Sequence, residues 1–326
     1  MRITRCNRIM AFARIVGPVG SHAAKLRELG LEIGTHEVIA GRRNIWGTLK
    51  GIGTGPTILM AGHLDTVGVD GYDNPFEPVV KDGKIYGRGS CDMKAGLAAY
   101  LEVVRHLKRT CIKLSGDLII AGVIDEEHAM ASSSDFGLYG PNVDYAIVAE
   151  PTNLQISTAH KGQMLTTITT KGLAAHSSMP ENGSNAIYHM AAVLTALQGY
   201  ADEVSKRVPD PICGAPSFSV GVIGGGDNAC SVPDVCEIDI DRRTIPGETS
   251  AQVIQELHTN MAHAKVAAPD LDYDIAIPFL DLPPLDTKPD ALATKAMVAA
   301  CEKVLGDVHN RHSLVPLMRQ ISAVRR

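Results

Sequence analysis

Acidic side chains and one histidine accompany the apolar runs in the first half of the sequence. In chain order they are His63, Asp65, Asp92, Glu126, Glu127 and Glu150. An imidazole combined with several carboxylates is a ligand set that borderline divalent ions such as zinc accept. Ligands in α/β proteins gather where strands end. The types and placement of these residues therefore predict a metal-dependent hydrolytic site.

His63 and Asp65 are two residues apart at the end of the apolar run that begins at Thr57. Side chains at i and i+2 of a strand point the same way. We therefore expect His63 to bind the metal and Asp65 to hold the other ring nitrogen, which fixes the tautomer. The alternative is a polar strand end without a metal.

The remaining acids each have two interpretations. Glu126 and Glu127 are adjacent, so one can bind a metal while the other faces the substrate as a general base; a solvated acidic loop is the alternative. Asp92 precedes an expected helix and could instead cap it, and Glu150 could be an ordinary strand exit. The occurrence of these acids together and in this order favours the metal site.

Short strands must hold these residues. Apolar runs typical of strands occur at 45–49, 57–60, 118–124 and 145–148. After Asp92, Met93, Leu97 and Leu101 recur at helical spacing and predict an amphipathic helix. Residues 79–86 predict a hairpin around an Asp-Gly turn. Strands that alternate with helices predict an α/β sheet covered on both faces.

The pattern changes after Glu150. Alternation replaces solid apolar runs at 163–171 and is strict at 235–241, which predicts strands with one solvent-exposed face. Helices are expected over 185–201 and 250–266, the second with an apolar stripe. These elements predict an inserted α+β domain.

The proline-rich stretch 278–289 is expected to be a linker that returns the chain to the first domain through a final helix at 290–305. The predicted fold class is α/β, with a mixed, mostly parallel sheet covered by helices and an inserted α+β sandwich. We place the first domain at 1–162 and 275–326, and the inserted domain at 163–274.

Composition excludes several classes of protein. The 326 residues carry 31 basic and 36 acidic side chains, which leaves no basic footprint for nucleic acid. No apolar run is long enough to span a membrane. Seven cysteines without a CxxC pair indicate neither a disulfide framework nor a cysteine zinc site. Residues 1–14 have four arginines and no acid, and we expect a plain start segment rather than a signal peptide, with a transit peptide as the alternative. The expected location is cytoplasmic.

Several stretches resemble the successive signatures of one family. They are 62–67 (GHLDTV), 87–94 (GRGSCDMK), 125–127 (DEE), 149–152 (AEPT), 172–178 (GLAAHSS) and 241–248 (DRRTIPGE). The family is that of the di-zinc amidohydrolases and peptidases, which includes acetylornithine deacetylase, succinyl-diaminopimelate desuccinylase, aminoacylase and glutamate carboxypeptidase. The resemblance runs from about Gly41 to Gly306 and implies a fold of the zinc-peptidase type, with the insert as a lid and dimerisation domain.

This resemblance also implies a role for each candidate. Asp92 would bridge two zinc ions, with cobalt or manganese as other possible ions. His63 and Glu150 would complete one metal site, and Glu127 would serve the other. Glu126 would be the catalytic base and Asp65 would orient His63.

In the inserted domain, His176 resembles the histidine that donates to the developing oxyanion, often across a homodimer formed through the lid domain. A surface histidine is the alternative. Arg243 resembles the arginine that holds a substrate carboxylate, for which a planar guanidinium is well suited. An ion pair with Asp241 is its alternative.

Two features depart from the family pattern. The tail at 307–326 lacks the segment in which the family supplies a further histidine ligand, and we expect a truncated or frame-shifted product, with His309 or His312 as possible substitutes. Cys230 stands where relatives commonly have asparagine.

The predicted function is a metal-dependent hydrolase that cleaves the amide bond of N-acyl amino acids, of the acetylornithine deacetylase or succinyl-diaminopimelate desuccinylase type. A metallo-carboxypeptidase or dipeptidase with the same site is one alternative, and a catalytically impaired relative is another. The expected partners are a small-molecule N-acyl amino acid or short peptide and a second copy of the chain, with no nucleic acid and no membrane.

Overall fold

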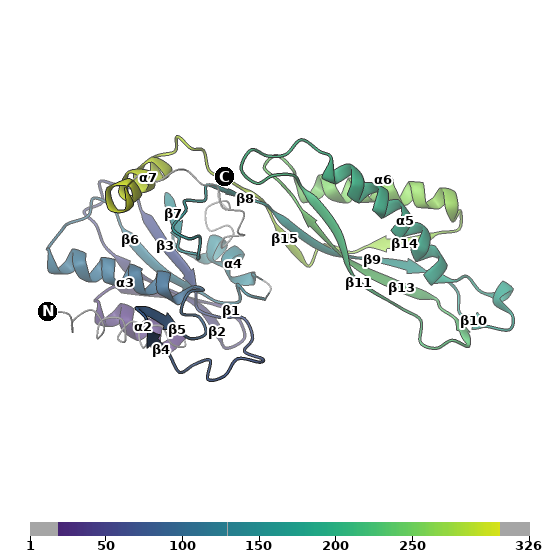
Figure 1. Ribbon diagram of the computed structural model, residues 1–326, viewed down its shortest axis with the longest axis horizontal. Helices are drawn as coiled ribbons and strands as arrows, with labels where there is room; N and C mark the ends of the chain where they lie inside the picture. The colour runs from purple at the N-terminus through teal and green to yellow at the C-terminus, as the bar shows by residue number, and fades with distance from the viewer. Residues whose placement is uncertain (1–18, 129, 307–326) are drawn as a thin grey trace. The chain divides into compact units, whose positions relative to one another are not determined.

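The computed structural model describes residues 19–128 and 130–306 (Figure 1). The predicted start segment 1–14 and the tail with His309 and His312 lie outside the described residues. Within the described part, the chain divides into two compact units, with the boundary between Gln155 and Ile156. Each unit is built around its own sheet. The placement of 275–326 with the first domain stays a prediction.

The first unit contains a five-stranded mixed sheet. In spatial order its strands are β1 (Glu32–Ile39), β2 (Arg42–Leu49), β6 (Leu118–Val123), β3 (Ile58–His63) and β7 (Tyr145–Val148). β3 runs parallel to both β6 and β7, whereas β1–β2 and β2–β6 are antiparallel. The predicted α/β class with a mixed sheet is confirmed. The sheet is not mostly parallel, because β1, which was not predicted, forms an antiparallel hairpin with β2.

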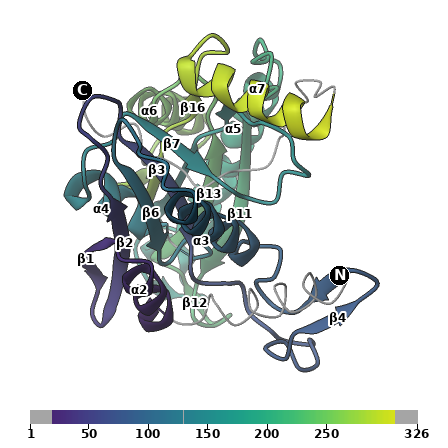
Figure 2. The same cartoon turned by 90° about the vertical axis from the view of Figure 1, so that its left-hand side faces the viewer.

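Helices cover both faces of this sheet (Figure 2). They are α2 (Val19–Glu28), α3 (Lys94–Arg109) and α4 (Ala131–Tyr139). On β6, Ile120 packs with Leu26 of α2 and Leu97 of α3, whereas Ile119 packs with Phe136 of α4. Alternate side chains of one strand therefore enter two separate cores, which explains its continuous apolar run.

The predicted hairpin is also present. β4 (Val79–Lys81) pairs with β5 (Lys84–Tyr86), and Asp82 and Gly83 between them have φ of 51° and 74°. Positive φ at both central residues is the geometry that favours an Asp-Gly turn.

The second unit is an antiparallel sheet with helices on one face. Its strands are β11 (Ser217–Gly225), β13 (Val235–Arg243), β9 (Gln163–Lys171) and β14 (Asp272–Ile275), with β15 (Leu280–Leu282) also paired to β9. Ile238 and Ile240 of β13 pack against Leu197 of α5 (Ala186–Ser205) and Leu257 of α6 (Ser250–Ala267). The predicted alternation is confirmed, because buried and less buried side chains alternate along β9 and β13.

Polar caps set where the two long helices of the second unit, α5 and α6, begin. The Asn185 side chain accepts hydrogen bonds from the main-chain N–H groups of Ile187 and Tyr188, and Thr249 forms a capping box with Gln252. Such caps satisfy donors that have no partner inside the helix. α5 continues four residues past the predicted end at 201.

The proline-rich stretch is not a plain linker. It contains β15 and also β16 (Leu285–Asp286), which pairs with β8 (Ala159–His160). The final helix α7 (Leu292–Leu305) ends at Gly306, whose φ of 82° and ψ of −149° are a conformation that glycine adopts far more readily than other residues. The smaller elements are η1 (Pro180–Asn182) and the paired strands β10 (Ala175–His176) and β12 (Ser231–Val232). None of the described helices has the length and apolar character that a membrane crossing requires.

Candidate active site

The parallel strands of the first unit bring the predicted site residues to one edge of the sheet. His63 is the last residue of β3, Glu126 and Glu127 follow β6, and Glu150 follows β7. Because β3 lies between β6 and β7 and runs parallel to both, their carboxyl ends meet. Asp92 joins them from the turn that precedes α3.

His63 is at the centre of this cluster. Its ring is buried, and Nε2 lies 3.1 Å from Oδ1 of Asp92 and 3.8 Å from Oε1 of Glu150. Nδ1 lies 3.0 Å from the main-chain oxygen of Asp65 and 3.6 Å from its Oδ1. Both ring nitrogens therefore face oxygen atoms, and Asp65 contacts the ring through its main chain more closely than through its carboxylate.

Two sets of side chains could each hold a metal ion. One is His63, Asp92 and Glu150, and the other is His63, Glu126 and Glu127; within each set the ligand atoms lie within 4.8 Å of one another. The six residues predicted for this site thus lie together. Glu126 and Glu127 were expected to diverge, but a carboxylate oxygen of each lies within 4.8 Å of the other and of a ring nitrogen of His63.

Negative charge dominates the electrostatics of the cluster. Burial, together with neighbouring carboxylates, raises the pKa of Glu150 to about 8 and that of Glu126 to about 7. Burial lowers the pKa of His63, but the carboxylates of Asp65, Glu150 and Glu126 outweigh this effect and raise that pKa to about 10. Burial also raises the pKa of Glu127. The cluster therefore favours a bound positive charge.

Unpartnered buried oxygens support the same conclusion. Oε1 of Glu150 and Oδ1 of Asp65 are buried and accept no hydrogen bond, because the ring nitrogens of His63 that face them lie 3.8 Å and 3.6 Å away. A buried carboxylate oxygen without a donor is unfavourable unless a cation compensates it. Carboxylate oxygens beside an imidazole are ligands of the kind that zinc accepts. The residues present thus fit a divalent metal ion.

A pocket adjoins this cluster. It has a volume of about 610 Å³, and its lining includes Arg42, Asp65, Asp125, Glu127 and His128. Nη1 of Arg42 lies 3.3 Å from Oδ1 of the buried Asp125. The pocket gives a small molecule access to the side of the cluster that holds Glu127.

Sequence reasoning missed two residues beside the glutamates. Asp125 is buried directly before Glu126, and Asn44 is buried on β2, where its amide contacts Ile124. The signal for Asp125 was its place in a run of three acids. Asn44 precedes the apolar Ile45 and Trp46, but the sequence shows neither its burial nor its partners, so only the structure reveals its role.

The other two predicted site residues belong to the second unit. His176 ends β10 and is exposed, and its Nδ1 accepts a hydrogen bond from the main-chain N–H of Ser178 at 3.1 Å. Arg243 ends β13, and its Nη2 lies 2.8 Å from Oδ2 of Asp241. The ion pair that was the alternative for Arg243 is therefore present, and its substrate role stays a prediction.

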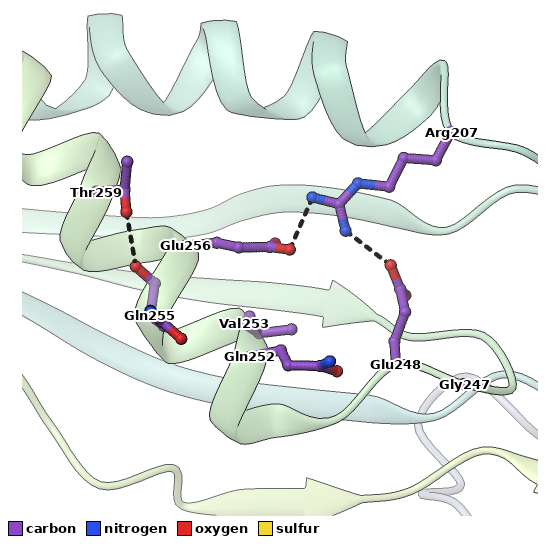
Figure 3. A pocket seen from close by; sticks show the side chains of 8 residues that line it. All are labelled: Arg207, Gly247, Glu248, Gln252, Val253, Gln255, Glu256 and Thr259. Carbon is purple, nitrogen blue, oxygen red and sulfur yellow. Dashed lines mark hydrogen bonds and ion pairs between the residues drawn. The ribbon is translucent and has the colours of Figure 1, made fainter.

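A pocket of about 480 Å³ in the second unit has a different character. Figure 3 shows Arg207 between two glutamates, with Nη1 2.8 Å from Glu248 and Nη2 2.9 Å from Glu256. These carboxylates are already neutralised by a side chain of the protein. The pocket therefore lacks the unpaired charge that marks the cluster around His63.

Comparisons with known proteins show the family of this chain. The sequence profile described as Peptidase family M20/M25/M40 matches residues 59–319. The acetylornithine deacetylase of Proteus mirabilis is 34% identical over 296 residues, which cover 86% of this chain and 73% of that enzyme. The acetylornithine deacetylase of Pectobacterium atrosepticum is 36% identical over 228 residues, which cover 67% of this chain but only 59% of that enzyme.

Solved structures share the fold. A tripeptidase from Staphylococcus aureus has a TM-score of 0.73 at 19% identity, covering 97% of this chain and 85% of its own. A metallo-carboxypeptidase from Sulfolobus solfataricus has a TM-score of 0.67 at 17% identity, covering 98% of this chain and 87% of its own. The predicted zinc-peptidase type of fold and the family resemblance are confirmed. The chain belongs to peptidase family M20/M25/M40, whose deacetylase and peptidase members hydrolyse amide bonds.

Proposed function

We propose that this chain hydrolyses the amide bond of an N-acyl amino acid, as an enzyme of the acetylornithine deacetylase type. The observation that carries the proposal is the gathering of one imidazole and four carboxylates at the edge of the parallel strands. The deacetylases that resemble it at 34% and 36% identity support this substrate class over a peptide.

Two zinc ions would be held by the cluster. As the family resemblance implies, Asp92 would bridge them, His63 and Glu150 would complete one site, and Glu127 would serve the other. His63, Asp92 and Glu150 form one of the two sets of side chains described above, and Glu127 belongs to the other. When bound, such ions lower the pKa of water and polarise a carbonyl group. Asp65 keeps His63 in place through the contacts at Nδ1.

Glu126 is the proposed general base. Its burial raises its pKa to about 7, so its carboxylate can take a proton from water near neutral pH and give it to the departing nitrogen. A carboxyl group at its ordinary pKa would be a weaker base for this transfer.

His176 is the proposed oxyanion donor. Because its Nδ1 accepts the Ser178 N–H, the neutral ring carries its proton on Nε2. The ring is exposed, so this N–H is free to reach a substrate. Arg243 would hold the substrate carboxylate, in exchange for part of its pairing with Asp241.

A homodimer through the second unit is part of the proposal. Ile187 and Tyr188 at the start of α5 are 40% and 74% exposed, and Val222 and Ile223 on the edge strand β11 are 59% and 57% exposed. Apolar side chains grouped on a sheet edge and a helix start favour a protein interface. We expect sedimentation to give a dimer, and Tyr188→Glu with Val222→Glu to give a monomer.

We also propose a cytoplasmic location. Six cysteines of the described part are free thiols, as a reducing compartment favours.

Activity on Nα-acetylornithine, after reconstitution with zinc and a count of ions per chain, tests the proposal. We expect two ions per chain, and Glu126→Gln should lower kcat by about 10²- to 10⁴-fold with the ion count unchanged. Glu28→Gln, a surface change on α2, is the matched control and should leave kcat unchanged.

Full activity of Glu126→Gln would contradict the assignment of Glu126 as the general base. Hydrolysis of dipeptides but not of acylated amino acids would favour the peptidase alternative, and bound zinc without turnover would favour an impaired relative.

A further inference from the structure

One buried amide fastens both ends of the loop that carries Glu126 and Glu127. Asn44 on β2 is fully buried, and its Oδ1 accepts a hydrogen bond from the main-chain N–H of Ile124 at 3.1 Å. Its Nδ2 donates to the main-chain oxygen of Ser132 at 2.8 Å. Ile124 directly follows β6 and Ser132 lies in the first turn of α4. The glutamates lie on the chain between these two anchors.

Both the oxygen and the NH2 group of the Asn44 side chain form hydrogen bonds. Nδ2 of Asn44 also donates to Oδ2 of Asp135 at 3.2 Å, so the side chain makes one bond as acceptor and two as donor. Asp135 is held in turn by Nδ1 of His36, which lies 2.9 Å from its Oδ1. A side chain that both accepts and donates is required, and a carboxylate or an apolar group of the same size cannot replace it.

Other contacts also hold the described residues of the loop. Nη1 of Arg42 lies 3.3 Å from Oδ1 of Asp125, and Oγ of Ser133 donates to the main-chain oxygen of Met130 at 3.0 Å. The N–H of Met130 donates to the main-chain oxygen of Asp125 at 2.7 Å, and the N–H of Glu127 donates to Oδ2 of Asp65 at 3.1 Å. Asp125 has a φ of 62°, in the left-handed region that a residue with a side chain adopts at a cost. Such a conformation persists where surrounding contacts impose it, and Asn44 supplies contacts at both ends.

We infer that Asn44 is a positioning residue that holds Glu126 and Glu127 in register with His63. This inference rests on the proposed function, because it assigns the loop a geometry needed for metal ligation and proton transfer. Side chains at such sites must be held to within about 0.5 Å, and neighbours with fixed rotamers do so. Asn44 contacts no reacting group itself and acts through the main chain of Ile124 and Ser132.

Asn44→Asp is the sharpest test. Aspartate keeps the size and the acceptor for Ile124, but it loses both donors and places a carboxylate against Asp135. Thr170→Val is the matched control, because Thr170 is equally buried and donates to the main-chain oxygens of Ala186 and Cys236 in the second unit. Both changes remove buried hydrogen bonds, but only one of them touches the loop.

Two measurements are made on the full chain under conditions where each variant is folded. Hydrogen exchange of the peptide that contains Glu126 and Glu127 is followed in the metal-free protein, and zinc affinity is measured by competition with a coloured chelator. For Asn44→Asp we expect exchange in this peptide to rise about tenfold or more and zinc affinity to fall about tenfold or more, in the range found for groups that support metal ligands. Thr170→Val should change neither.

Unchanged exchange in Asn44→Asp would overturn the inference, whatever the metal does. Faster exchange with unchanged zinc affinity would also overturn it, because the loop would then be held without benefit to the site. If the unaltered protein binds no zinc, the proposed function fails, and the exchange data still decide whether Asn44 holds the loop. If Asn44→Asp does not fold, Asn44→Ser gives the same comparison.

Discussion

The main-chain N–H of Glu127 donates a hydrogen bond to Oδ2 of Asp65 at 3.1 Å. The bond joins the end of β3 to the loop after β6, so the carboxylate that lies beside His63 also fixes the position of a neighbouring candidate ligand. Burial raises the pKa of Asp65, but His63 and, to a smaller extent, the N–H of Glu127 outweigh it and lower that pKa. Asp65 thus couples the histidine to the glutamates.

Asp65→Asn should weaken metal binding without unfolding the protein. Asparagine can still accept the N–H of Glu127, but it removes the negative charge near Nδ1 of His63. We expect zinc affinity to fall about 10- to 100-fold, as for other groups that support a metal-bound histidine. Competition with a chelator measures the change.

Asp117→Asn is the matched control for this prediction. Asp117 accepts a main-chain N–H from Gly51 at 3.0 Å and pairs with Lys50, but it lies away from the cluster. Equal zinc affinity in Asp65→Asn and Asp117→Asn would contradict the role assigned to Asp65.

The stability of the metal-free protein should fall as pH rises from about 6.5 to about 8. Glu126 and Glu150 have folded-state pKa values of about 7 and about 8, above the ordinary 4.5, and His63 has one of about 10 against 6.5. In this window the folded chain therefore holds protons that the unfolded chain releases, and the free energy of unfolding decreases with pH.

Thermal unfolding with and without zinc measures this slope. A bound divalent ion replaces the protons, so zinc should remove most of it. Glu150→Gln should flatten the slope in the metal-free protein. The buried His22, whose pKa is lowered to about 4, acts in the opposite direction but only below about 6.5. A metal-free protein whose stability rises across the window would contradict the charge distribution described here.

The residues of the metal cluster could be predicted because their signal is local. Each follows a strand or precedes a helix, and the sheet topology alone brings them together. The alternation in β9 was equally readable, since a strand with one buried face has a period of two. By contrast, α4 was missed because three of its first four residues are serine, which favours caps and turns over helix interiors.

Asn44 could not be assigned from sequence for a different reason. Nothing in its neighbours along the chain reveals that it faces Ile124 and Ser132, which are 80 and 88 residues away. The role of a buried amide depends on the partners that the fold supplies. The same holds for Arg243, because only the structure shows that its ion pair with Asp241 forms.

Arg243→Ala should raise KM for substrates with a free α-carboxylate and leave kcat nearly unchanged. A guanidinium that binds a carboxylate equally in the ground and transition states affects binding alone. For a substrate analogue whose α-carboxylate is replaced by a carboxamide, KM should not rise. A comparison of KM for the two substrates measures the effect. Asp241→Asn, which frees the guanidinium, should change stability by less than about 1 kcal/mol, because the pair is 30% exposed on each side. An equal rise in KM for both substrates would contradict the assignment.

Arg242, the residue before Arg243, has a structural role. Its side chain is fully buried, with Nη2 2.8 Å from Glu248 and Nε donating to the hydroxyl of Tyr200 at 3.2 Å. Arg242→Leu removes the fully buried member of this ion pair and leaves the part-buried Glu248 with Arg207 as its remaining ion-pair partner, so we expect the free energy of unfolding to fall by about 3 kcal/mol. Arg43→Leu, which breaks the exposed pair with Glu37, should cost less than about 1 kcal/mol. The single tryptophan, Trp46, lies in the other unit, so far-ultraviolet circular dichroism during urea unfolding is the measurement to use. A similar loss in both variants would mean that the burial of Arg242 has no particular energetic weight.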